Sequence, residues 1–393
     1  MRSRLPIHLI VPIVLFGLVT LAEHTVSGRA ATTADQDVDL VARARAIHDR
    51  VLTLDTHVDI NPANFTAERS YATRLETQVN VPKMEEGGLD AAFFIVYVGQ
   101  STGPEAFTAA GYDAAYAQAV RKFDAIHHLV TTLAPDRIGL ALTAADVRRI
   151  EASGRKVALI GVENGYPLGE DVDRVKEFYE RGARYLSLAH NGHNQLSDSN
   201  TGERDGTWRW NGISPLGRQV IAALNAYGIM IDVSHPSKAS MLQAIDLSTV
   251  PVIASHSSVR ALCDHSRNLD DEQLDALRAN GGVAQMTAFA AYIRTPACTA
   301  GTPRADDPSR ASVSDFIDHV DYAVKRIGID HVGISSDFDG GGGIVGWSDA
   351  SETFNVTLEL VSRGYTEEQI AKLWSGNLLR VMEAVESGAT ARR

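Results

Sequence analysis

Short apolar runs recur along the chain between about residue 51 and residue 338. Their apolar residues are nearly continuous rather than alternating, which is typical of strands buried on both faces of a parallel sheet. Each run therefore predicts a strand. The runs begin at Val51, Ala91, Lys156, Arg184, Gly228, Pro251, Gly282 and His331.

Segments with helical periodicity separate many of these runs, and they begin at Asp35, Gly111, Asp171, Ser214 and Val313. Ser214 and Pro215 suit an N-cap and a first turn, and Gly228 suits the end of the same helix. Alternating strands and helices favour an α/β fold, a closed (β/α)₈ TIM-like barrel. An open doubly wound sheet is the alternative, but no GxGxxG follows an early strand.

The first thirty residues differ from the rest of the chain. Arg2 and Arg4 precede an apolar run from Leu5 to Leu21, and small residues follow it. This order is typical of a secretory signal peptide. We therefore expect residues 1–30 to be a cleaved leader, residues 31–393 to form one catalytic domain, and the mature protein to be periplasmic or secreted without a membrane span. An uncleaved amino-terminal anchor helix is the alternative.

Composition narrows the class of protein. The chain is 44% hydrophobic and 22% charged, as ordinary globular proteins are. Its net charge of −12 argues against nucleic acid as a partner, because phosphate binding needs clustered Lys and Arg. In an exported chain the two cysteines, Cys263 and Cys298, suggest a disulfide, although two buried thiols would fit the spacing equally well.

Residues with metal-binding side chains stand at the ends of the predicted strands. They are His57, Asp59, Glu163, His190, His235, His256 and Asp337. The carboxyl ends of barrel strands meet at one mouth, so residues far apart in sequence become neighbours there. Imidazole and carboxylate groups are suitable ligands for zinc and similar ions. The pattern therefore predicts a metal site at the barrel mouth.

Five of these residues are too many ligands for one tetrahedral zinc that also keeps a water. Two Zn²⁺ ions that share a carboxylate would use them all. One ion would be held by His57, Asp59 and Glu163, and the other by Glu163, His235 and His256. Two ions about 3.5–4 Å apart can hold a bridging water or hydroxide and polarise a carbonyl. The predicted chemistry is hydrolysis.

A series of motifs connects these residues to a known family. The motifs are DTHVDI, GVENG, YLSLAHNGHN, DVSHPS, SHSSVR, HSRNLDDEQL, SSDFDG and SGNLLRVM, in that order from about Ile47 to Met382. In this the sequence closely resembles the renal or membrane dipeptidase family of zinc metallopeptidases. The resemblance implies an exported binuclear zinc dipeptidase that cleaves dipeptides and tolerates D-residues on the carboxyl side.

The resemblance also implies roles for individual residues. His190 matches a histidine that contacts the substrate and steadies the oxyanion, and Arg267 matches an arginine that binds the terminal carboxylate. Asp337 matches the acid that shuttles a proton to the leaving amine, and Tyr292 matches a substrate-binding tyrosine. Cys263 and Cys298 fall near a family disulfide pair. A homodimer is implied by the family alone.

Two other readings share some of these features. Another two-metal barrel hydrolase, such as a lactonase, deaminase, phosphotriesterase-like enzyme or β-lactam or amide hydrolase, would keep the fold and the metals but cleave a different bond. An exported binding protein on a degenerate scaffold would keep only the fold. Arg267 separates the first of these from a dipeptidase, because only a substrate with a free carboxylate needs it.

Overall fold

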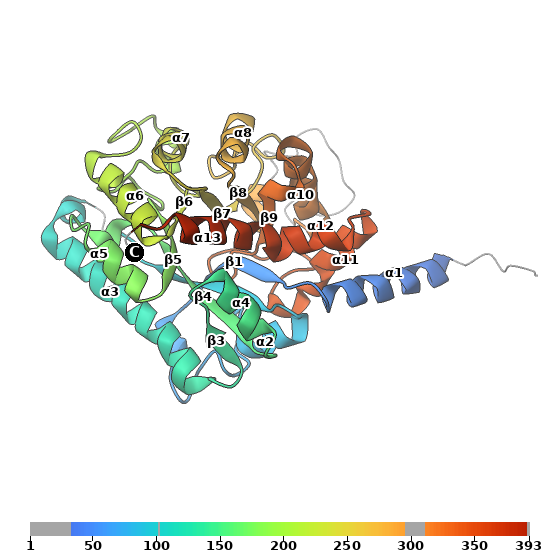
Figure 1. The fold of residues 1–393 in the computed structure, drawn as a ribbon. Helices are drawn as coiled ribbons and strands as arrows, with labels where there is room; N and C mark the ends of the chain where they lie inside the picture. Colours follow the sequence, from blue (N-terminus) through green and yellow to red (C-terminus); the bar gives the residue numbers. More distant parts are fainter. Residues whose placement is uncertain (1–32, 101–102, 295–310, 391–393) are drawn as a thin grey trace, which may run out of the picture. The chain divides into compact units, whose positions relative to one another are not determined.

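The computed structural model describes residues 33–100, 103–294 and 311–390 (Figure 1). Contacts divide the chain after Asp39, and the unit from Leu40 to Arg393 contains every described strand. Within the described ranges, no helix is long and apolar enough to cross a membrane. The predicted leader, residues 1–30, lies outside those ranges and stays a prediction.

Eight parallel strands form a nearly closed barrel, as predicted. They are β1 (Leu54–Asp59), β2 (Ala91–Tyr97), β4 (Lys156–Glu163), β5 (Ala183–Ser187), β6 (Met230–Asp232), β7 (Ile253–Ser257), β8 (Val283–Thr287) and β9 (Val332–Ser335), hydrogen-bonded in that order. A parallel bridge between Val58 and Phe338, with the Asp59 N–H donating to the Phe338 carbonyl at 2.8 Å, joins β1 to the segment after β9. This contact excludes the open doubly wound sheet.

One further strand was not predicted. The short β3 (Ile138–Leu140) pairs with the beginning of β4, where Ile138 lies opposite Lys156. The strand β5 pairs with β4 only from Ile160 onward. One edge of β4 pairs with β2. On the opposite edge, β3 pairs with the beginning of β4, which β5 leaves unpaired.

Helices follow the strands around the barrel, and Figure 1 shows α3, α5, α6, α7, α8 and α10 in succession around the sheet. The predicted helices are all present, as α1, α3, α5, α6 and α10. The helices are α1 (Thr33–His48), α2 (Val81–Gly87), α3 (Ala109–His128), α4 (Ala144–Glu151), α5 (Arg174–Glu180), α6 (Pro215–Tyr227), α7 (Lys238–Leu247), α8 (Asp271–Asn280), α9 (Ala290–Ile293), α10 (Val313–Ile327), α11 (Phe354–Ser362), α12 (Glu367–Ala371) and α13 (Asn377–Gly388).

The core has two sides because side chains alternate along each strand. In β2, Phe94 and Val96 pack with the large cluster that includes the surrounding helices. Phe93 and Ile95 belong to a second cluster, which combines α13 with the first residues of several strands. α13 therefore packs against the amino ends of the strands, and the carboxyl ends remain available for the site.

Candidate metal and substrate site

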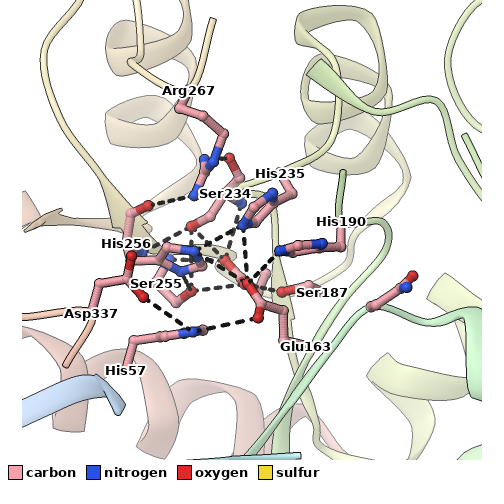
Figure 2. Close-up of polar contacts among 12 residues, drawn as sticks. His57, Glu163, Ser187, His190, Ser234, His235, Ser255, His256, Arg267 and Asp337 are labelled. Atoms are coloured by element: carbon pink, nitrogen blue, oxygen red, sulfur yellow. Dashed lines mark hydrogen bonds and ion pairs between the residues drawn. The ribbon is translucent and has the colours of Figure 1, made fainter. Parts of the chain in front are cut away.

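The predicted metal-type residues meet around Glu163, the last residue of β4 (Figure 2). Its Oε1 lies 3.0 Å from His235 Nε2 and 3.3 Å from His256 Nε2. Its Oε2 lies 3.6 Å from His57 Nε2. Glu163 is buried and stands between histidines from β1, β7 and the segment after β6, which is the geometry of a shared carboxylate.

Two acidic residues complete the His57 side of this cluster. His57 Nε2 lies 3.7 Å from Asp59 Oδ2 and 3.9 Å from Asp337 Oδ1. His57 and Asp59 are separated by one residue in β1, so both side chains point the same way, as predicted. Ligand atoms of His57, Asp59 and Glu163 lie within 4.8 Å of one another, and so do those of Glu163, His190 and His235.

The unsatisfied polar atoms fit bound cations. His57 Nε2 is buried and has no hydrogen-bond partner among the described residues. His235 Nε2 and His256 Nε2 are only 3.0 Å apart. Ring nitrogens this close must share a proton or direct their lone pairs at a common ion. Three carboxylates beside them supply the negative charge that divalent cations compensate.

A tyrosine fixes the orientation of His57. Tyr185 donates its hydroxyl hydrogen to the Thr56 carbonyl at 3.1 Å, and its oxygen lies 2.9 Å from His57 Nδ1. His57 Nδ1–H therefore donates to Tyr185, and Nε2 is the ring nitrogen that faces Glu163. Gly161 makes room for the tyrosine ring, because a Cβ at this position would lie 2.2 Å from it.

The buried carboxylate of Asp232 fixes the orientation of His256 through Ser255. Asp232 accepts hydrogen bonds from Ser255 N at 2.8 Å, from Ser255 Oγ at 2.8 Å and from the Ser187 hydroxyl. Because Ser255 gives its hydrogen to Asp232, its oxygen accepts from His256 Nδ1 at 2.8 Å. His256 Nε2 is then the ring nitrogen that could bind a metal ion.

Burial and neighbouring charges shift the pKa values of the titratable groups in the site in different directions. Burial lowers the pKa of His235 and of His256 well below the ordinary value, so both stay neutral. Burial would also lower the pKa of His57, but Glu163 and Asp59 outweigh it and hold that pKa well above the ordinary value. Burial raises the pKa of Asp337 to about 8, and the neighbouring carboxylates act in the same direction.

The backbone around Asp337 is constrained. Asp337 follows β9 with φ +60°, in the left-handed region that Asp and Asn adopt more readily than most residues. A Cβ at Gly340 would lie 2.4 Å from both Asp337 Oδ1 and Asp59 Oδ2. The loop that begins at Gly340 therefore lies close to Asp337.

The predicted substrate residues line the same cavity as the metal-type residues. This cavity has a volume of about 830 Å³, and His190, Arg267, Tyr292 and Asp337 are among its lining residues. Arg267 is almost fully buried, and its guanidinium donates to the Ser234 carbonyl and, at 3.0 Å, to the His256 carbonyl. Its Cζ lies 5.4 Å from the centre of the Tyr292 ring.

Other lining residues lacked a signal in the sequence. They include Tyr97, Lys122, Phe289 and Asp339. Tyr97 ends β2, so the strand-end rule could have found it, but its side chain is not a usual metal ligand. Lys122 lies within α3, where nothing in the helical pattern distinguishes it from a surface lysine.

His193 and Cys263 both lie outside the lining of this cavity. His193, in the loop after β5, pairs with Asp198 at 3.0 Å and does not line the cavity. Cys263 is buried, and Cys298 lies outside the described residues. Their disulfide therefore stays a prediction.

Comparisons with known proteins agree with this geometry. The model of the family described as membrane dipeptidase (peptidase family M19) matches residues 41–393. Dipeptidase tcpJ of Claviceps purpurea is 34% identical over 81% of this chain and 72% of its own length. The probable dipeptidase PvdM of Pseudomonas aeruginosa has a crystal structure with a TM-score of 0.81 and 31% identity, over 90% of this chain and all of that one.

A third relative was solved with a ligand. The structure of a metallopeptidase from Rhodobacter sphaeroides, liganded with a phosphinate mimic of the dipeptide L-Ala-D-Ala, has a TM-score of 0.69 and 25% identity. It covers 85% of this chain and 99% of that chain. The family is metal-dependent, and the His, Asp and Glu clusters described above are the groups in this chain that could hold the metal.

Proposed function

The chain belongs to the membrane dipeptidase family and is a metallo-dipeptidase, and from this premise we propose that it is an exported enzyme with two zinc ions that hydrolyses dipeptides, including those with a D-residue on the carboxyl side. The observation that carries the proposal is the position of Arg267. Arg267 lines the same cavity as Glu163, His235 and His256. A single cavity can therefore hold a terminal carboxylate and the scissile bond together.

The metal ligands in this proposal are the five residues grouped around Glu163. One zinc is held by His57, Asp59 and Glu163, and the other by Glu163, His235 and His256. Bound zinc ions supply a Lewis acid for the scissile carbonyl and lower the pKa of a bound water. Tyr185 and Ser255 bind the Nδ1 atoms of His57 and His256, so the Nε2 atoms of both rings are directed at the site.

The remaining lining residues bind and orient the substrate. Arg267 receives the terminal carboxylate, because a guanidinium fork matches a planar anion, and the ring of Tyr292 packs beside it. The Nε2 of His190 lies 3.9 Å from Glu163 Oε1, and in this proposal it donates a hydrogen bond to the carbonyl oxygen of the substrate as negative charge develops. Asp337, whose Oδ1 lies 3.9 Å from His57 Nε2, carries the proton that the leaving amine requires.

The size of the cavity supports tolerance of a D-residue. A volume of about 830 Å³ is large for a dipeptide, so the side chain on the carboxyl side has room in either configuration. The relative from Rhodobacter sphaeroides, solved with a mimic of L-Ala-D-Ala, supports this part of the proposal.

A panel of L,L and L,D dipeptides, assayed before and after chelation, tests the proposal. We expect turnover of both kinds, loss on chelation and recovery with zinc. Undiminished activity in the metal-stripped protein would refute the role of the metals. Asp337→Asn is expected to abolish turnover and keep two zinc ions per chain.

Arg267 decides between a dipeptidase and another two-metal hydrolase. Arg267→Ala is expected to raise KM for dipeptides by about 10- to 100-fold, because a charge-assisted hydrogen bond contributes roughly 1.5–3 kcal/mol. Lactone or ester substrates without a carboxylate should be unaffected by the substitution. If dipeptide turnover is unchanged in Arg267→Ala, carboxylate recognition is not its role, and the alternative hydrolases gain support.

A further inference from the structure

A lysine that the metal site does not use reaches the substrate cavity from α3. Lys122 is partly buried and lines the cavity together with Glu163 and His190. Its Nζ lies 5.6 Å from the centre of the Tyr97 ring. Tyr97 in turn is paired in register with Glu163, and its ring centre is 4.5 Å from that of His190. The ammonium group is therefore part of the cavity wall next to the proposed reaction centre.

Lys122 differs from the other buried lysines in having no ion-pair partner. Lys83 pairs with Asp349 at 2.8 Å, and Lys156 pairs with Asp90 at 3.0 Å. Among the residues that the structure describes, no carboxylate or other acceptor forms a hydrogen bond or an ion pair with Lys122. Burial lowers the pKa of Lys122, and the charges of Asp59 and Glu163 oppose this shift.

Bound metal ions would leave Lys122 still more isolated. Asp59 and Glu163 are proposed zinc ligands, so their negative charge is compensated when the metals bind. An ammonium group has three hydrogen-bond donors and no acceptor, and leaving it without a partner at a partly desolvated position is costly. A substrate that brings its own anion to this point relieves the cost.

The order of strands in the barrel places Lys122 opposite Arg267. Lys122 packs over Tyr97, the last residue of β2, whereas Arg267 donates to His256 in β7. In the order β1-β2-β4-β5-β6-β7-β8-β9, β2 and β7 are four steps apart in either direction around the closed barrel. A dipeptide whose terminal carboxylate binds Arg267 therefore directs its amino-terminal residue toward Lys122.

We propose that Lys122 is a specificity-determining residue that binds an acidic side chain on the amino-terminal residue of the substrate. The inference rests on the proposed function, because it takes Arg267 as the site of the terminal carboxylate. A basic amino-terminal residue would be repelled by Lys122, and a neutral one would leave its donors unmatched. A glutamate or aspartate side chain supplies the acceptor, in a charge-assisted hydrogen bond.

Besides Arg267, the cation Arg69 also lines the cavity, and its effect must be separated from that of Lys122. Arg69 is exposed, and its Nε donates to Asn64 Oδ1 at 2.6 Å. This contact already orients part of its guanidinium away from a ligand. Arg69→Met therefore serves as the matched control for Lys122→Met, since both substitutions remove one positive charge from the cavity.

The experiment compares kcat/KM for Glu-Ala, Gln-Ala and Lys-Ala, three dipeptides of similar size and different side-chain charge. The zinc-loaded wild-type enzyme is expected to prefer Glu-Ala to Gln-Ala by about tenfold and to disfavour Lys-Ala. Lys122→Met should bring the ratio of Glu-Ala to Gln-Ala near one, and Lys122→Arg should keep most of it. The ratio in Arg69→Met should match the wild type.

Each outcome decides a separate point. A ratio cancels any general loss of activity, and zinc content measured on every variant shows that the metals are present. Equal turnover of Glu-Ala and Gln-Ala by the wild type, an unchanged ratio in Lys122→Met, or loss of the ratio in Arg69→Met would overturn the role of Lys122 alone. Failure to hydrolyse any dipeptide would instead overturn the proposed function, and this inference with it.

Discussion

Removing the hydroxyl group of Tyr185 tests whether the contact to His57 tunes metal binding. Tyr185 is fully buried and packs on Phe93 with ring centres 5.0 Å apart, so a phenylalanine fits the same space in Tyr185→Phe. The substitution deletes only the oxygen that lies 2.9 Å from His57 Nδ1. The His57 ring then has no described acceptor for Nδ1–H, and the tautomer that directs a lone pair toward Glu163 loses its support.

The expected effect on zinc follows from the contact to His57, because the other hydrogen bond of this hydroxyl group goes to the Thr56 carbonyl. A typical hydrogen bond contributes about 1 kcal/mol, and a buried donor left without a partner costs about 1–3 kcal/mol. Contacts of this kind behind a metal ligand typically change metal affinity 10- to 100-fold. We therefore expect zinc to bind 10- to 100-fold more weakly at the position held by His57 and Asp59. The other position depends on His235 and His256 and should change less, although both positions share Glu163.

Zinc affinity can be measured without reference to activity. Metal-stripped protein is titrated with zinc against a chromophoric chelator, which resolves a tighter and a weaker binding step. Tyr185→Phe should weaken one step and leave the folded protein's circular dichroism unchanged. Tyr227→Phe is the matched control, because Tyr227 lies at the end of α6 and does not contact the site. If both steps in Tyr185→Phe equal those of the wild type, the hydrogen bond does not tune the metal.

Three further predictions follow from contacts around the barrel. Ser255→Ala breaks the chain from Asp232 to His256, so the same titration should show the zinc step of His256 weakened by about tenfold. Gly161→Ala places a Cβ 2.2 Å from the Tyr185 ring and should weaken the same zinc step as Tyr185→Phe, while an unchanged titration would show that the ring can move without effect. His319 is buried with both ring nitrogens hydrogen-bonded to backbone, and burial lowers its pKa from 6.5 to about 4. Since the unfolded chain takes up that proton first, the contribution of His319 is complete above pH 6.5 and is lost as pH falls toward 4, by up to about 3 kcal/mol. Urea unfolding of metal-free protein at the two ends of this range should show a smaller loss for His319→Gln, and equal losses would contradict the assignment.

The barrel and the metal-type residues were predictable because two simple rules acted together. Continuous apolar runs mark strands buried on both faces, and a parallel barrel brings the carboxyl ends of those strands to one mouth. His57, Glu163 and His256 each end such a run, and the structure brings their ligand atoms together. The substrate residues Arg267 and Tyr292 lie beyond the strand ends, and only the family resemblance indicated them.

The pattern of apolar and polar residues could not predict features that depend on side-chain packing. The three residues of β3 are too few to show a period, and pairing with β4 alone makes them a strand. Tyr185 was an ordinary apolar position within a predicted strand, and its contact with His57 spans 128 residues of sequence. Lys122 had the helical spacing of a surface residue, and its place in the cavity depends on how α3 packs against β2.

The proposed metal ligands and the proposed substrate-binding residues are supported by different parts of the molecule. His57 and His256 lie within strands, and hydroxyl groups inside the barrel fix their rings. Arg267 lies in the loop after β7, and Lys122 extends from α3, outside the barrel wall. Loops and helices at the mouth can change without disturbing the strands that carry the ligands. Substitutions in the two groups should therefore change different properties. Lys122→Met should change substrate preference at unchanged zinc affinity. Tyr185→Phe should change zinc affinity at unchanged substrate preference.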